Sequence, residues 1–102
     1  MKDTFKIPAK INICGIDYET IFIDKIDHSP NTLGFYVEDE QKIYLRNNIK
    51  SQKQEQVFIH ECLHALLAET GLHNRLGDAE ENFIIAVTAG LYPMIKQLIE
   101  TK

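Results

Sequence analysis

The sequence has little of several residue types, and each shortage argues against a class of protein. It has no tryptophan and two cysteines, Cys14 and Cys62, which are too few and too far apart for a disulfide framework. Eleven Lys and Arg against fifteen Asp and Glu give a net charge of −4, which does not indicate nucleic-acid binding. Neither a signal peptide nor an apolar run of about 18 residues is apparent. We therefore expect a soluble, reduced cytoplasmic protein with no nucleic-acid or membrane partner.

The remaining composition is that of one small folded domain. The chain has 102 residues, of which 44% are hydrophobic. This length supports one modest hydrophobic core and leaves little room for a second. Because no repeat, low-complexity segment or linker divides the chain, we expect a single domain over residues 1–102.

The first half of the chain, about residues 5–47, is typical of short strands that form two hairpins. A compact turn at 15–17 connects the first pair, residues 38–41 connect the second, and residues 28–32 have the composition of a loop. The predicted strands, rich in β-branched and aromatic residues, are 10–14, 19–24, 34–37 and 42–45. We expect them to form a small antiparallel sheet.

The second half predicts two long helices. The first covers about residues 51–70, because Ser51 and Gln54 have the spacing of a capping box and Gly71 is suited to end a helix. The fold class predicted is therefore α+β, with the sheet followed by the helices.

The second helix is predicted over about residues 78–100. Asp78 and Glu81 again have the spacing of a capping box. Pro93 lies inside this segment and predicts a kink or a local break, because proline lacks the backbone N–H that a helix interior needs.

The predicted first helix carries the pattern H-E-x-x-H, formed by His60, Glu61 and His64. Histidines four residues apart lie on one helical face, where both rings can reach one metal ion at about 2.0–2.1 Å. Glu61 lies about 100° around the helix and is placed to take a proton from a metal-bound water. The apolar flanks 57–59 and 65–68 suggest that the helix packs on a core and lines a cleft. The alternative is that both histidines are half-buried and have a structural role. This alternative does not explain the position of Glu61.

A catalytic zinc ion needs a third protein ligand, and the motif supplies two. The position six residues after His64 is Thr70, so the common third histidine is absent. His73 is a possible loop ligand, although an exposed loop histidine is the simpler interpretation. Glu80 and Glu81 are better candidates, but each also has a structural explanation as a first-turn or capping carboxylate. Helical projection places Glu80 on the apolar face and slightly favours it.

The sequence resembles the small phage and mobile-element proteins related to the ImmA/IrrE metallopeptidases, which are minimal zincins. The resemblance covers most of the chain, through residues 11–18, 34, 41–45, 60–64 and 81–92. It implies a minimal zincin fold in which zinc is held by His60, His64 and Glu81. Similar proteins often carry a second acid where this chain has Asn82, and Pro93 is also a departure.

We therefore expect a zinc-dependent metallopeptidase that cleaves a specific intracellular protein, with Glu61 as general base on zinc-bound water. A phage or mobile-element protein that acts in the host cell is compatible with this expectation. A substrate strand could pair with the edge at 42–45. Tyr36 and Tyr44 are candidate hydrogen-bond donors to the oxyanion of the reaction. The alternative is that both are aromatic residues that only pack on the strands. Tyr92 lies roughly 16 Å along the helix from Glu81 and is expected to pack elsewhere.

Two other functions use the same residues. In a metal-binding adaptor, zinc would stabilise the domain, and His73 or Cys62 would complete four protein ligands, although Cys62 projects away from the histidines. In a degenerate relative, the fold would serve as an interaction module without metal. The sequence leaves substrate and oligomeric state open.

Overall fold

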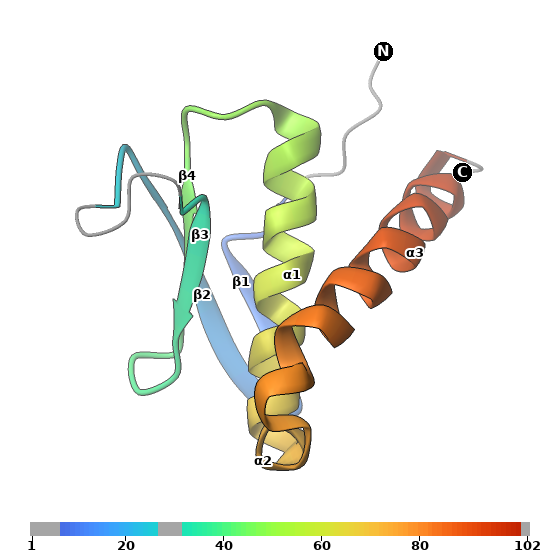
Figure 1. Ribbon diagram of the computed structural model, residues 1–102. Coiled ribbons are helices and arrows are strands. Elements are labelled where there is room, and N and C mark those ends of the chain that lie inside the picture. The colour runs from blue at the N-terminus through green and yellow to red at the C-terminus, as the bar shows by residue number, and fades with distance from the viewer. Residues whose placement is uncertain (1–6, 27–31, 101–102) are drawn as a thin grey trace.

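The computed structural model describes residues 7–26 and 32–100 (Figure 1). Its strands are β1 (Lys10–Ile13), β2 (Ile16–Ile23), β3 (Gly34–Val37) and β4 (Lys42–Arg46). Its helices are α1 (Ser51–Thr70), α2 (Leu72–Leu76), the 3-10 helix η1 (Gly77–Ala79) and α3 (Glu80–Glu100). The predicted α+β class, both hairpins and both long helices are confirmed. Most of the predicted loop at 28–32 lies outside the described residues.

The four strands form one mixed sheet in the order β1-β2-β4-β3. Both hairpins are antiparallel, but β2 and β4 are parallel, from the pair Glu19–Lys42 to the pair Ile23–Arg46. The prediction of a wholly antiparallel sheet is therefore wrong for the central pair. The prediction of a substrate-binding edge at 42–45 is also wrong, because β4 is an inner strand and β3 is an outer one.

The first hairpin turns one residue earlier than predicted. Cys14 and Gly15 form a two-residue turn with φ angles of 55° and 90°, which is the left-handed pair that a type I′ turn requires. Asn12 stabilises this turn by accepting a hydrogen bond from the Gly15 N–H at 3.0 Å. The second strand therefore begins at Ile16 rather than at residue 19.

Helix α1 packs on the sheet and forms the core with it (Figure 1). The buried core residues come from β1, β2, β4 and α1, namely Ile13, Tyr18, Ile43, Leu45, Phe58 and Ala65. Gly34 lets β3 approach α1 closely, since a Cβ at this position would lie 2.6 Å from Val57 Cγ1 and 2.9 Å from the Tyr44 carbonyl oxygen. The same close packing brings the outer strand β3 next to the H-E-x-x-H helix.

The ends of α1 agree only in part with the predicted signals. Lys50 occupies the N-cap and makes no side-chain cap hydrogen bond, so the predicted Ser51–Gln54 capping box is wrong. Gln54 instead donates its side-chain N–H to the Arg46 carbonyl oxygen at 2.8 Å, which ties the helix start to β4. Gly71 ends the helix in the left-handed conformation, as predicted.

Helix α3 packs against α1 and is tied to it by a buried polar group. The Glu55 side chain, in a residue 1% exposed, accepts hydrogen bonds from the Tyr92 hydroxyl at 2.6 Å and the Lys96 ammonium at 3.3 Å. Tyr92 therefore packs away from the histidines, as expected from its distance along the helix. The helix continues through Pro93, so the predicted local break is absent.

The described residues form a compact body with a Cα radius of gyration of 13.6 Å, close to the value of about 13 Å typical of a folded chain this long. By length and composition, the stretch Leu72–Glu100 could cross a membrane, and 22% of its most apolar window is buried. Core helices of water-soluble proteins pass the same test, so this stretch is weak evidence for a membrane span.

The approach of β3 to α1 can be tested by adding one methyl group. We expect Gly34→Ala to lower the free energy of unfolding by about 1–3 kcal/mol, because the new Cβ meets Val57 and backbone. Gly90→Ala is the matched control on α3, where no atom lies within 4 Å, and it should raise that free energy by about 0.5–1 kcal/mol. Urea denaturation measures both. Equal stabilities of the two variants would contradict the close packing.

Candidate metal centre

The structure brings the three predicted metal ligands together, two from α1 and one from the start of α3. One potential ligand atom from each of His60, His64 and Glu81 lies within 4.8 Å of the others. The Glu81 carboxylate lies 2.9 Å from His64 Nε2 and 3.1 Å from His60 Nε2. Both rings therefore direct Nε2 at the same carboxylate.

This group of side chains could hold a metal ion. Ligands about 2.0–2.1 Å from a tetrahedral zinc ion lie about 3.3 Å from each other. The two contacts between histidine Nε2 atoms and Glu81, at 3.1 and 2.9 Å, are a few tenths of an ångström shorter, which is the length of hydrogen bonds in the absence of a metal. Two histidines and one glutamate are also a donor set that catalytic zinc sites use, with a fourth position left for water.

Glu80 lies on the other side of the His64 ring from Glu81. Its carboxylate is 2.6 Å from His64 Nδ1 and 2.6 Å from His73 Nδ1, and the residue is 6% exposed. When His64 donates from Nδ1 to Glu80, its Nε2 keeps the lone pair that a metal needs. Glu80 is thus placed to orient the His64 ring, while Glu81 contacts the Nε2 atoms of both His60 and His64.

The helical projection favoured Glu80 for a reason that the structure explains. Glu80 does lie on the buried side of α3, as the projection indicated. From there it reaches the Nδ1 side of His64, whereas the Nε2 side faces the more exposed Glu81. The two glutamates therefore do not compete for one position, because Glu80 contacts Nδ1 and Glu81 contacts Nε2 of the same ring.

The charges around His64 favour proton sharing with Glu80. Burial alone lowers the pKa of His64, but the hydrogen bond to Glu80 and the negative charge of Glu61 raise it above its ordinary value. Burial likewise raises the pKa of Glu80, and its hydrogen bonds to His64 and His73 bring it below the ordinary value. Glu80 therefore stays ionised and remains an acceptor for both histidines.

Glu61 lies beside the cluster but outside it. The residue is 9% exposed, and burial raises the pKa of its carboxyl to about 7, with a further increase from Glu81 and an opposing effect of His64. A base whose pKa lies near the working pH can both take up and release a proton.

The two candidate oxyanion tyrosines lie on opposite faces of the sheet. Tyr36 stacks on His64 with ring centroids 6.0 Å apart, and burial raises the pKa of its hydroxyl, which stays a donor at neutral pH. Tyr44 stacks on Phe35 and donates to Glu40 at 3.0 Å. Of these two tyrosines, only Tyr36 is therefore near the three candidate ligands.

The other residues considered at the sequence level do not join the cluster. His73 lies in α2 rather than in a loop, with its side chain 55% exposed and its Nδ1 on Glu80. Cys62 packs against the core, where burial raises the pKa of its thiol to about 12 and disfavours the thiolate that zinc requires. Asn82, which stands where similar proteins often carry a second acid, is exposed.

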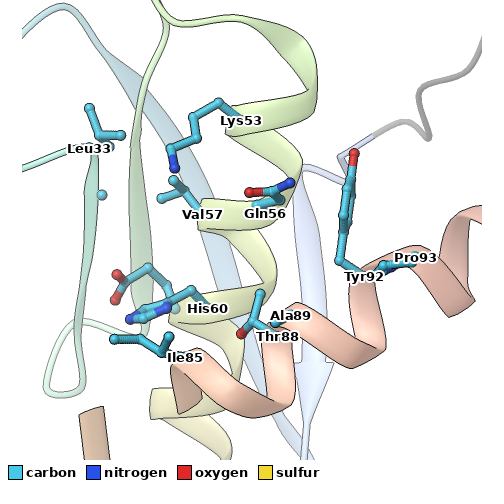
Figure 2. A pocket seen from close by; sticks show the side chains of 12 residues that line it. Leu33, Lys53, Gln56, Val57, His60, Ile85, Thr88, Ala89, Tyr92 and Pro93 are labelled. Atoms are coloured by element: carbon cyan, nitrogen blue, oxygen red, sulfur yellow. The ribbon is translucent and has the colours of Figure 1, made fainter. Parts of the chain in front are cut away.

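A pocket of about 550 Å³ opens beside the histidines (Figure 2). It lies between α1, α3 and the start of β3, and His60 and Glu61 contribute to its lining. Its volume is within the range of about 300–1,000 Å³ of typical ligand pockets. Comparisons with protein-family models, with curated proteins and with solved structures returned no match for the chain.

The role of Glu80 can be separated from that of a ligand by metal affinity. We expect Glu80→Gln to weaken zinc binding about 10- to 100-fold, because loss of a partner that orients a ligating histidine has this effect. Asp78→Asn removes an exposed carboxylate two residues away and should leave the affinity unchanged. Competition with a chromophoric chelator measures both. Equal affinities in the two variants would exclude the orienting role.

Proposed function

We propose that the chain is a zinc-dependent metallopeptidase of minimal zincin type, similar to the ImmA/IrrE-related proteins, which hydrolyses a peptide bond in a specific protein. The approach of His60, His64 and Glu81 to one another, with Glu61 beside them, carries the proposal. Action in the cytoplasm, as a phage or mobile-element product in its host, belongs to the same proposal.

The residues divide the chemistry among them. His60, His64 and Glu81 would hold the zinc ion, which would supply Lewis-acid activation of water and of the substrate carbonyl. Glu61 accepts a proton from the attacking water and delivers it to the leaving amine. Glu80 keeps His64 in the tautomer that leaves Nε2 unprotonated. Tyr36 is the hydroxyl donor nearest to the histidines among the tyrosines considered.

The substrate backbone has a strand to pair with next to this centre. Strand β3 is an outer strand of the sheet, and its Tyr36 stacks on His64. An extended peptide that adds to the β3 edge would therefore pass the histidines. This edge replaces the one at 42–45, which is covered by β3 itself.

Catalysis and metal binding can be separated at Glu61. We expect Glu61→Gln to lower hydrolysis of a peptide library by at least about 100-fold, because the amide cannot accept the proton. Zinc should stay bound at the wild-type stoichiometry, since the three ligands are intact. Mass spectrometry of the products and elemental analysis give the two readouts.

The matched control is Glu100→Gln, which removes an exposed carboxylate at the far end of α3 and should change neither quantity. Unchanged hydrolysis in Glu61→Gln would remove Glu61 from the mechanism. Loss of zinc from that variant would instead make Glu61 part of the metal site.

A non-catalytic interaction module is the second candidate, and one observation favours it. Helix α3 exposes large apolar side chains that could meet a protein partner, namely Phe83, Ile85, Met94, Leu98 and Ile99. Stoichiometric zinc in a wild-type chain that cleaves no peptide in the library would favour the metal-binding form of this module. A chain that takes up no zinc would favour the metal-free form.

A further inference from the structure

The pocket beside the metal centre has chemically different ends. His60 and Glu61 lie at one end, and Lys53 lies at the other, two helical turns earlier on α1 and about 10 Å away along the helix axis (Figure 2). The walls between them are mostly apolar and include Leu33 and Val57, while Ile85 lies beside His60. Such a pocket suits a ligand in which an apolar side chain is followed by a polar group.

Lys53 supplies a positive charge at its end of the pocket. Lys53 is exposed and lines the pocket, and Figure 2 shows its ammonium group on the side of Val57. None of the ion pairs formed within residues 7–26 and 32–100 involves Lys53. The charge is therefore available to an anionic group of a ligand.

Helix α3 offers the pocket a backbone acceptor. Ala89 and Pro93 both line the pocket and are four residues apart. In a regular helix the N–H of residue 93 would bond to the carbonyl oxygen of residue 89, but proline has no N–H. The Ala89 carbonyl thus lacks the donor that it would have in a regular helix, and Ala89 is one of the residues that line the pocket.

We propose that this pocket binds the part of a peptide next to the scissile bond, with an apolar side chain between α1 and α3 and a following carboxylate on Lys53. The assignment of this peptide segment to the neighbourhood of a scissile bond rests on the proposed peptidase function. The binding of the apolar side chain and of the carboxylate does not. Because an extended residue spans about 3.5 Å, the carboxylate lies two or three residues from the metal centre. It belongs either to the chain end or to an acidic side chain.

Binding can be measured without catalysis by nuclear magnetic resonance titration of the full-length chain after chelator treatment. The probes are N-acetyl-glycyl-leucine with a free carboxylate and the same peptide as its C-terminal amide. We expect both to shift backbone signals near Val57 and Ala89. The free acid should bind about two- to fivefold more tightly, the range of a solvent-exposed ion pair.

Lys53→Met keeps the aliphatic stem and removes the charge, so it should abolish the preference for the free acid over the amide. Lys50→Met removes an exposed charge from the same end of α1, at a residue that does not line the pocket, and should preserve the preference. Pro93→Ala gives α3 an N–H for the Ala89 carbonyl and should weaken both probes about two- to tenfold.

A third probe, N-acetyl-glycyl-leucyl-aspartyl amide, distinguishes the two sources of carboxylate. If the third probe binds as tightly as the free acid, the carboxylate on Lys53 is that of an acidic side chain. If it binds as weakly as the amide, the carboxylate is that of a chain end. Equal binding of acid and amide to the wild type, no binding of either at millimolar concentration, or loss of the preference in Lys50→Met would overturn the proposal.

These outcomes are independent of the peptidase. A chain that binds the probes through Lys53 but cleaves no peptide retains the pocket assignment and loses the proposed function. A chain that cleaves peptides with no dependence on Lys53 retains the function and loses the pocket assignment.

Discussion

The contacts of His64 with two consecutive glutamates are the interaction on which the candidate site depends. Glu80 lies at its Nδ1 and Glu81 at its Nε2, so the start of α3 is held against the middle of α1 by both sides of one ring. Consecutive residues of a helix point about 100° apart, which allows two neighbours to reach around a third group. Without this arrangement α1 would carry two histidines and α3 would carry no ligand for them.

A second polar attachment completes the placement of α3. Glu55 binds Tyr92 and Lys96 near the start of α1, while the histidines bind the glutamates further along it. The two attachments lie on either side of the pocket, so they set the separation of the helices there. A buried ion pair contributes little net stability, but loss of one partner would leave the other charge buried and unpaired, so α1 and α3 pack with these partners in contact. That alignment determines the width of the pocket.

Local patterns predicted much of this structure. The position of the H-E-x-x-H helix, its end at Gly71 and both hairpins follow from periodicity and turn residues within one segment. The parallel pairing of β2 with β4 could not be predicted, because strand composition does not identify a partner across a crossover. The separate roles of Glu80 and Glu81 could not be predicted either. A helical projection reports which side of a helix is apolar, but it does not report which atom of the His64 ring each glutamate contacts.

The central claim is that His60, His64 and Glu81 together bind one zinc ion. X-ray absorption spectroscopy of the zinc-loaded chain tests it most directly, because the spectrum reports the type and number of ligands around the metal. The account predicts one zinc ion per chain with two imidazoles, nitrogen and oxygen ligands at about 2.0–2.1 Å, and no sulfur. A sulfur ligand at about 2.3 Å, fewer than two imidazoles or no stoichiometric zinc would contradict it.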